Sequence, residues 1–265
     1  MSNEAVKFKN SNSHLNFRKM SLIELQKLPM HNGILDFKIT KTSFLMLNIL
    51  NDDSSVVKYF WQGSHDLLCL DLWYELSLKV GSFIDVGAHT GLYTLTNLKA
   101  NKENDLICFE PNFMNMSRLI TNLRLNGIDK KAQTILAAAS NFSGKTKFNI
   151  LTEKSYLSKG GKIDKEGEEI NVYSLDDMYF NKLEKPLQAI KIDTEGEDYK
   201  VLLGAEKLIN KYRPKIIIEI REENKLEIKS FFLKYNYKIF NIFNLKEEID
   251  LDDVKINNID NFFAK

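Results

Sequence analysis

Two glycines spaced four apart, Gly87 and Gly91, follow an apolar stretch that contains one acidic residue, Asp85. Glycine adopts positive φ without steric cost and lets a ligand approach the bare backbone. A helix that begins at Leu92 would direct unpaired N–H groups and the positive end of its dipole toward these glycines. The pattern therefore predicts a strand, a tight turn and a helix that together bind a small anionic or nucleotide-like group.

A carboxylate at the end of the next apolar segment lies at a suitable distance from this turn. Glu110 comes 19 residues after Gly91. In a doubly wound fold, an acidic side chain there accepts hydrogen bonds from both ribose hydroxyls of a nucleoside. Pro111 would end the strand beside the ligand, and Ala138 and Ala139, which end the third predicted strand, leave room for a base. The alternative is that Glu110 is only a solvated residue at a strand end.

The spacing of the turn distinguishes between two kinds of nucleoside cofactor. Dinucleotide-binding turns follow the pattern G-x-G-x-x-G, whereas here His89 occupies the middle position and Asp85 precedes the first glycine. An acidic residue would repel a pyrophosphate, but it could hold the amino acid part of S-adenosylmethionine or fix the turn. His89 acts either as a base or as a structural hydrogen-bond partner. We therefore expect S-adenosylmethionine, bound by Asp85, Gly87, Ala88, His89, Thr90, Gly91, Tyr93, Glu110, Pro111, Ala138, Ala139 and Asp193.

A second group of charged residues follows the fourth predicted strand, in the stretch Ile190 to Glu197. Ligands of open α/β sheets bind at the carboxyl ends of the strands, so this is the expected reaction zone. Alternation along an extended chain would place Lys191, Asp193 and Glu195 on one side. We expect Asp193 and Glu195 to act as base or to orient an acceptor, Lys191 to tune their charge, and Glu219 to be a further catalytic candidate.

Two other interpretations of this group are open. Glu195 and Glu197 could simply favour the N-terminus of the helix that follows. Asp193 and Glu195 could also hold a divalent metal, but no third ligand is evident and no metal is predicted.

From residue 82 onward, strand and helix patterns alternate, which is typical of βαβ units and a mostly parallel sheet. Strands are predicted at 82–87, 106–110, 133–139, 187–193, 214–220 and 237–243, and helices at 92–100, 113–126, 198–212 and 224–235. The interval 144–174 departs from this rhythm. Its strands at 145–151 and 169–174, joined by a loop at Gly160 and Gly161, predict an insertion or flap beside the site.

The segments before residue 82 are expected to cover the site. A helix is predicted at 21–28, a hairpin at 42–61 with its turn at 51–54, and a helix at 66–79. Near the other end, 246–261 predicts a further hairpin at the sheet edge. We divide the chain into an N-terminal extension (1–80), a cofactor-binding domain (81–245) and a C-terminal tail (246–265).

Six motifs together resemble the FkbM family of methyltransferases, over about residues 60–245. They are Asp85–Gly91, Phe109–Pro111, Leu123–Asn126, Ser174–Asp177, Ile190–Glu197 and Pro214–Glu219. The resemblance implies a class I, Rossmann-like fold with a mostly parallel seven-stranded sheet and helices on both faces. It also implies methylation of a hydroxyl on a sugar or a polyketide-like compound with S-adenosylmethionine. The family commonly has Asn where this chain has His89.

Composition narrows the choice of partner. The 37 basic and 36 acidic residues nearly cancel, which disfavours nucleic acid as a partner. A small-molecule or glycan acceptor is what the resemblance implies. RNA methylation and a non-catalytic nucleotide-binding module are the alternatives. Cys69 and Cys108 stand in apolar strings, as buried thiols do in a reducing compartment, and no apolar stretch is long enough for a membrane span. We expect a cytoplasmic enzyme.

Three further residues are considered for contacts outside the main motifs. His65 could contact the substrate, and the apolar Phe262 and Phe263 near the C-terminus could dock on a second copy of the chain.

Overall fold

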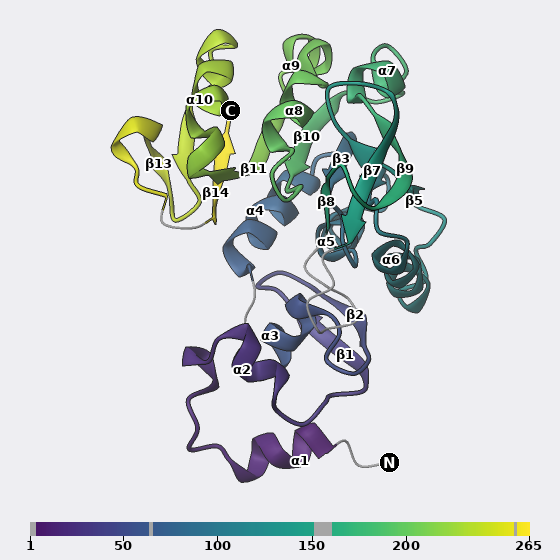
Figure 1. The fold of residues 1–265 in the computed structure, drawn as a ribbon, viewed down its shortest axis with the longest axis vertical. Coiled ribbons are helices and arrows are strands. Elements are labelled where there is room, and N and C mark those ends of the chain that lie inside the picture. The colour runs from purple at the N-terminus through teal and green to yellow at the C-terminus, as the bar shows by residue number, and fades with distance from the viewer. Residues whose placement is uncertain (1–3, 64–65, 151–160, 257–258) are drawn as a thin grey trace.

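The strands predicted from residue 82 onward form a central sheet (Figure 1). The computed structural model describes residues 4–63, 66–150, 161–256 and 259–265. The described strands of this sheet are β3 (Ser82–Val86), β4 (Asp105–Phe109), β5 (Ala132–Ile135), β10 (Leu187–Ile192), β11 (Lys215–Arg221), β12 (Ile239–Asn241), β13 (Asn244–Glu248) and β14 (Ile259–Ala264). Their order is β13-β12-β14-β11-β10-β3-β4-β5, eight strands where seven are expected.

The five strands from β5 to β11 run parallel to one another. All five residues of β3 are buried, because helices cover both faces of the sheet and leave no solvated side. The chain builds outward from β3 to β4 and β5, and then returns to the other side of β3 with β10 and β11. This reversal opens a crevice at the carboxyl ends of β3 and β10.

The segment predicted to be a C-terminal tail contributes a strand to the antiparallel part of the central sheet. β14 lies between β11 and β12 and pairs antiparallel with both. It contains Phe262 and Phe263, which are 0% and 4% exposed. These residues belong to the core, so the prediction that they dock on a second copy is wrong. The β12–β13 pair, in place of a hairpin at 246–261, occupies the edge.

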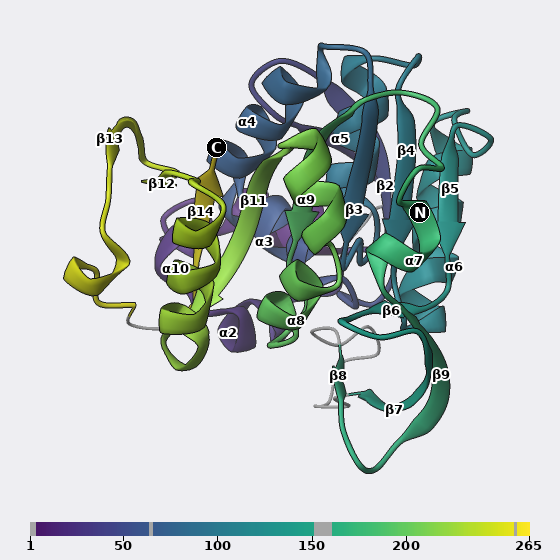
Figure 2. The ribbon, with the colours of Figure 1, turned by 90° about the horizontal axis from the view of Figure 1, so that it is seen from above.

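Helices cover the two faces of the sheet (Figure 2). On one face lie α4 (Leu67–Ser77), α5 (Leu92–Ala100) and α6 (Phe113–Leu125), and on the other α7 (Leu175–Tyr179), α8 (Asp198–Leu203), α9 (Glu206–Tyr212) and α10 (Lys225–Lys234). Alternate residues of each strand serve the two cores: Phe83 packs on the first and Ile84 on the second. None of the helices within the described ranges has the length and apolar character of a membrane span.

The helix predicted at 198–212 is two helices, α8 and α9, with a break at Gly204. A side chain at Gly204 would meet the carbonyl oxygen of Ser140 at 2.0 Å. The Gly204 carbonyl oxygen also accepts from the Asp176 N–H, at 2.8 Å. Two other segments of the same chain, at Ser140 and Asp176, therefore lie against Gly204 where the helix is interrupted.

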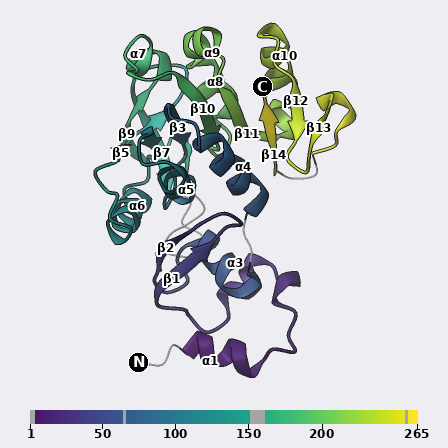
Figure 3. The ribbon, with the colours of Figure 1, turned by 180° about the vertical axis from the view of Figure 1, so that it is seen from behind.

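Residues 4–63 form an N-terminal unit below the sheet, near the carboxyl ends of the strands (Figures 1 and 3). Its elements are α1 (Glu4–Ser11), η1 (Phe17–Lys19), α2 (Leu22–Gln26), β1 (Gly33–Lys38), β2 (Ser43–Asn48) and α3 (Ser54–Gln62). β1 and β2 form a hairpin that turns at 39–42. The predicted hairpin across 51–54 is wrong, because 56–60 lies in a helix.

The start of α3 explains this difference. The side chain of Asp53 accepts hydrogen bonds from the backbone N–H groups of Ser55 and Val56 and so caps the helix. At the other end Gly63 adopts φ 75°, a left-handed helix stop. Val56, Val57 and Phe60 are buried at helical spacing, so tertiary packing and two caps override the β-propensity of valine.

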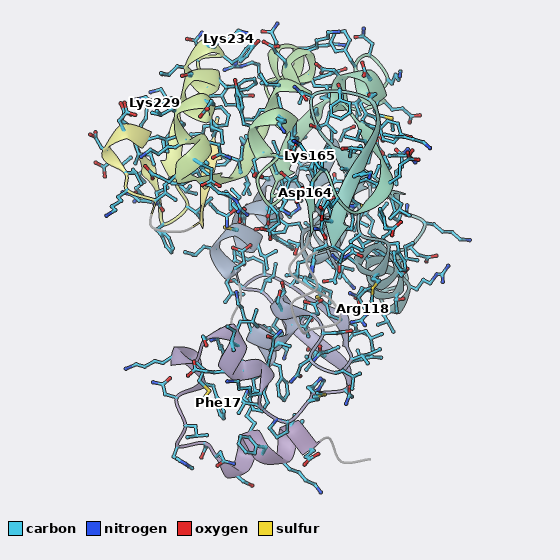
Figure 4. The ribbon with its side chains drawn as sticks, in the orientation of Figure 1. Phe17, Arg118, Asp164, Lys165, Lys229 and Lys234 are labelled. Atoms are coloured by element: carbon cyan, nitrogen blue, oxygen red, sulfur yellow. The ribbon has the colours of Figure 1, made fainter. Side chains whose placement is uncertain are left out.

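Side chains of α6 hold the N-terminal unit against the sheet domain. Arg118 makes two hydrogen bonds to the carboxylate of Asp52, at 3.1 and 2.6 Å (Figure 4 labels Arg118 beside this junction). Asn122 accepts from the Leu47 N–H at 2.9 Å. Its amide donates to the Thr90 carbonyl oxygen at 2.8 Å, which links β2 to the turn that follows β3.

A second, four-stranded sheet projects beside the central one (Figure 2). It consists of β6 (Ala138–Ala139), β9 (Glu168–Tyr173), β7 (Gly144–Ile150) and β8 (Gly161–Ile163), in that order. The insertion predicted at 144–174 is thus a sheet, although Gly160 lies outside the described residues. The strand predicted at 133–139 is split, because β5 pairs with β4 while β6 pairs with β9.

Candidate active site

A cavity of about 430 Å³ lies at the carboxyl ends of β3, β4, β10 and β11. This volume is within the usual range for small-molecule sites. Residues 86–90 and 137–139 line it together with Lys191, Asp193 and Glu219. The turn and the charged group that the sequence predicts separately therefore face one space.

The glycine turn has the conformation that its sequence predicts. Gly87 and Gly91 have φ values of 78° and 99°, and His89 also has a positive φ, 49°. The N–H groups of Gly87 and Ala88 donate to the Phe109 carbonyl oxygen, at 3.0 and 2.9 Å. A side chain at Gly87 would meet the carbonyl oxygen of Asp193 at 1.8 Å. Glycine is required there because the turn passes directly against the end of β10.

Glu110 lines the cavity and is 4% exposed. One carboxylate oxygen accepts from the His89 N–H at 2.9 Å, and the other accepts from the N–H of Asn112 at 2.9 Å and the amide of Asn115 at 3.4 Å. Burial raises the pKa of Glu110, although these donors oppose the shift. The carboxylate thus fixes the turn, and because a carboxylate offers about four lone-pair positions it can accept further donors from the cavity.

Asp85 and Gly91 belong to the turn but do not line the cavity. Asp85 is fully buried beneath it, where one oxygen accepts from the Thr94 hydroxyl at 2.8 Å. Its other oxygen has no hydrogen-bond partner and lies 3.7 Å from the Lys191 ammonium. Burial raises the pKa of Asp85, and Lys191 opposes that shift. This arrangement fits the alternative that Asp85 fixes the turn.

Lys191 connects the turn to the carboxylates. Its ammonium donates to the Gly87 carbonyl oxygen at 2.9 Å, lies 3.4 Å from the Asp193 carboxylate and stands 5.0 Å from the centre of the Tyr93 ring. Burial would lower the pKa of Lys191, but Asp193 and Asp85 outweigh it and the pKa is raised. A permanently charged lysine therefore holds Asp193 in the cavity wall.

Glu195 lines the same cavity as Lys191 and Asp193, but it reaches the cavity from a turn and not from an extended strand. Its φ of 56° takes the chain out of the extended conformation. Its carboxylate pairs with Arg221 at 2.6 Å, and Arg221 also contacts Glu219 at 3.2 Å. Burial and nearby carboxylates raise the pKa of Glu219 to about 8, although Arg221 opposes the shift.

The loop between β10 and α8 is held by Asp198, a residue without a predicted role. Asp198 accepts from the N–H and hydroxyl of Thr194, at 2.9 and 3.0 Å, and from the Gly196 N–H at 3.2 Å. Burial raises its pKa to about 6. Glu197 lines the cavity and accepts from the Ser140 hydroxyl at 3.0 Å, so it is more than a charge at a helix N-terminus.

Most of the remaining residues predicted to bind the cofactor line the cavity, whereas the two cysteines lie in the core. Thr90, Tyr93, Pro111, Ala138 and Ala139 all line the cavity. Both cysteines are buried and free, as expected, and burial raises the pKa of each thiol. His65 lies outside the described residues.

Several lining residues were not anticipated. They come from the N-terminal unit and α4 (Leu22, Ser54, Ser55, Lys58 and Asp66) and from the four-stranded sheet (Phe148, Gly161 and Ile163). Only the capping pattern of Asp53 signals that Ser54 begins a helix, and no motif indicates that this helix meets the glycine turn. Within the described ranges, no three His, Cys, Asp or Glu side chains group as a metal site would require.

Comparison with solved structures shows the class of protein that has this fold. A S-adenosylmethionine-dependent methyltransferase from Agrobacterium tumefaciens shares 8% identity; the match covers 90% of this chain and 72% of that protein, with a TM-score of 0.50. At this identity the likeness shows the fold alone. It is the α/β, Rossmann-like methyltransferase fold with a mixed, mostly parallel sheet, as predicted.

The methyltransferase FkbM from Methylobacillus flagellatus KT is 15% identical, with a TM-score of 0.48. The match covers 81% of this chain and 54% of that protein, so the chain spans about half the length of that enzyme. A search of curated proteins found no match.

The family model described as the methyltransferase FkbM domain matches residues 85–239, more than half of the 265 residues. The chain therefore belongs to the FkbM family of S-adenosylmethionine-dependent methyltransferases.

The donor groups of the cavity fit this cofactor. Glu110 supplies a buried carboxylate beside the turn, as a ribose requires, and Ala138 and Ala139 leave space for a flat base. Gly87, Ala88 and His89 line the same cavity as Asp193 and Glu219.

Proposed function

We propose that this methyltransferase methylates a hydroxyl of a sugar or glycan precursor, with carboxylates that orient the acceptor and remove its proton. The observation that carries the proposal is the position of Asp193 and Glu219. Asp193 follows β10, Glu219 lies near the carboxyl end of the neighbouring parallel strand β11, and both line the same cavity as the glycine turn. The methyl acceptor would lie between the turn and these carboxylates.

Gly87, Ala88, His89 and Glu110 would hold the cofactor at the glycine turn. When bound, S-adenosylmethionine supplies an electrophilic methyl group. The remaining task of the protein is to position a hydroxyl and to accept its proton. Positioning alone can contribute about 7–11 kcal/mol to lowering the barrier.

Asp193 is the residue suited to orient the acceptor. Its side chain is 37% exposed, which leaves its oxygens accessible in the cavity wall, while Lys191 holds it at 3.4 Å. A carboxylate in this position accepts a hydrogen bond from a hydroxyl. Lys191 would keep the Asp193 carboxylate in place as the acceptor replaces water.

Glu219 is the residue suited to accept the proton. Its side chain is 12% exposed, and its raised pKa gives it a basicity near that of an efficient general base at neutral pH. Arg221 would stabilise the ionised form, and Glu195 would hold Arg221 in place. This assignment moves the base from Asp193 or Glu195 to Glu219.

The choice of a neutral or glycan acceptor over RNA is supported by the charge of the chain and by the residues of the cavity wall. The net charge of +1 offers no field to gather RNA, and the cavity wall at β10 and β11 is made of carboxylates, which suit hydroxyl donors. Two free, buried cysteines fit a reducing compartment, and we place the enzyme in the cytoplasm, with a small-molecule or glycan acceptor.

Transfer of a radiolabelled methyl group by the full chain to neutral oligosaccharides, nucleotide sugars and RNA tests this proposal. We expect incorporation into carbohydrate; incorporation into RNA, or into none of them, contradicts the proposal.

Once a carbohydrate acceptor is identified, the dependence of the rate on pH distinguishes the roles of the two carboxylates. Glu219→Gln should remove the rise in rate that leads to about pH 8, whereas Asp193→Asn should lower the rate and keep that rise.

A matched control for Glu219→Gln is Glu222→Gln. Glu222 stands just after β11 and loses the same charge, but its partner is Lys225 and it does not line the cavity. It should retain the wild-type profile.

A further inference from the structure

Asp66 brings a carboxylate into the cavity from a segment that precedes the matched family domain. It stands at the start of α4 with φ 51°. The hydroxyl of Tyr93 donates to one of its oxygens. Tyr93 is itself 7% exposed, and its carbonyl oxygen accepts from the indole N–H of Trp73 at 3.0 Å. A buried aromatic residue therefore fixes the orientation of the carboxylate.

Asp66 and Asp193 act on the same neighbours. The Lys191 ammonium lies over the Tyr93 ring and contacts Asp193. The negative charge of Asp66 also helps to raise the pKa of Lys191. The Tyr93 ring thus stands between a carboxylate from α4 and the lysine that holds Asp193. The two carboxylates belong to one part of the cavity.

The N-terminal unit adds hydroxyl groups to this wall. Ser54 and Ser55, at the start of α3, line the cavity. Asp53 is fully buried, and it accepts from the Thr90 hydroxyl at 2.5 Å while it caps α3. Because this contact joins α3 to the glycine turn, the serines have a defined place in the wall.

Charge in the cavity disfavours an anionic acceptor. The described lining residues include six acidic side chains and two lysines: Asp66, Glu110, Asp193, Glu195, Glu197 and Glu219 against Lys58 and Lys191. The raised pKa of Glu219 favours its protonated form at neutral pH, so the other five acidic residues supply most of the negative charge. Arg221 and Lys200 offset part of this charge from outside the lining. A phosphate would be placed among like charges, whereas a hydroxyl donates to carboxylates.

We propose that Asp66, fixed by Tyr93, binds a second hydroxyl of the acceptor, and that the acceptor is a neutral sugar that carries no phosphate or nucleotide. This inference rests on the proposed function, since it specifies the substrate of the same cavity. Asp66 would be a specificity-determining residue, because it contacts the acceptor at a hydroxyl other than the one that is methylated.

The test compares methyl transfer to neutral methyl glycosides and oligosaccharides with transfer to the corresponding sugar phosphates and nucleotide sugars. We expect kcat/KM to be at least about tenfold higher for a neutral acceptor, as repulsion between a phosphate and one nearby carboxylate predicts. Preference for phosphorylated acceptors would overturn the inference and leave the proposed function standing. Transfer to neither class of acceptor would contradict both the inference and the proposed function.

Variants of Asp66 separate its role from a structural or cofactor-binding one. Asp66→Asn keeps a residue that tolerates positive φ, and it should raise KM for the neutral acceptor about tenfold or more with little change in affinity for S-adenosylhomocysteine. Tyr93→Phe should raise the same KM by a smaller factor. Glu75→Gln, which removes a charge from the exposed side of α4 where Glu75 pairs with Lys41, is the control and should change neither quantity.

Two results with these variants would overturn the role of Asp66. An unchanged KM in Asp66→Asn would exclude contact with the acceptor. A large loss of affinity for S-adenosylhomocysteine in the same variant would place Asp66 against the cofactor instead.

Discussion

Two groups of polar residues line the cavity, one at the glycine turn and the other around Asp193 and Glu219, and they are held in different ways. At the turn, Glu110 is bound by backbone N–H groups and a side-chain amide, and the N–H groups of Gly87 and Ala88 are bound by a carbonyl oxygen. In the other group, charged side chains bind one another, in the contacts of Lys191 with Asp193 and of Arg221 with Glu219.

This difference suggests that the two groups respond to different changes. A site built largely from backbone depends on the path of the chain, so it should fail when a glycine is replaced. A site built from ion pairs depends on protonation and on single side chains. Cofactor binding and acceptor chemistry should therefore be separable by mutation.

The largest effect is expected at Gly87. Gly87→Ala introduces a side chain that meets the Asp193 carbonyl oxygen at 1.8 Å, and we expect a loss of more than about 4 kcal/mol in the free energy of unfolding. Urea denaturation measures this. Gly63→Ala is the matched control, since Gly63 has a similar φ, 75°, with nothing within 4 Å; it should lose only about 1–2 kcal/mol. Equal losses would mean that the clash is relieved.

A pair of substitutions in the two groups should affect different kinetic quantities. Asp193→Asn should lower kcat by about 10²-fold, because the acceptor would no longer be held in position, with cofactor affinity nearly unchanged. Glu110→Gln should weaken S-adenosylhomocysteine binding by about 1–3 kcal/mol. Calorimetric titration and steady-state kinetics on both variants check this. If both variants alter the same quantity, the two groups are not separate.

The group around Asp193 and Glu219 should also make stability depend on pH. The raised pKa of Glu219 means that the folded state binds its proton more tightly than the unfolded state, so this residue lowers stability as pH rises toward about 8. Relative to wild type, Glu219→Gln should gain up to about 1.4 kcal/mol per pH unit within that window. Urea denaturation between about pH 5 and 8 measures it. A constant difference across that range would contradict the buried-carboxyl account.

The smallest effect concerns the contact between the N-terminal unit and the turn. A double-mutant cycle of Asp53→Asn and Thr90→Val should give a coupling energy of about 1–2 kcal/mol, because the hydroxyl donates to the carboxylate at 2.5 Å. Thr96→Val replaces Thr90→Val in the control cycle. The Thr96 hydroxyl bonds within its own helix, to Leu92, so its coupling to Asp53 should be near zero. Similar couplings in both cycles would contradict the direct contact.

The parallel half of the fold could be predicted because its signals are local. β3 and β10 are mostly apolar segments, and the two glycines of the turn after β3 are close to it in the sequence. The helix at 92–100 was predicted with its observed bounds. In each case the residues that determine the conformation are adjacent in the chain.

The predictions fail where contacts between residues far apart in the sequence determine the local conformation. Val56 and Val57 favour a strand by propensity, but burial on one face of α3 makes them helical. Glu195 leaves the predicted alternation because its backbone turns to positive φ beside Arg221. Asp66 could not be predicted as part of the site, since it reaches the cavity only through the packing of α4 and Tyr93.

The position of β14 has a consequence for synthesis of the protein. β11 carries Glu219 and pairs with β14 along residues 216–221, yet β14 is the last strand of the sheet to leave the ribosome. Until residues 259–264 emerge, β11 presents an unpaired edge that can bind other extended chains. The nascent chain can therefore complete the glycine turn well before it completes the wall that holds Glu219.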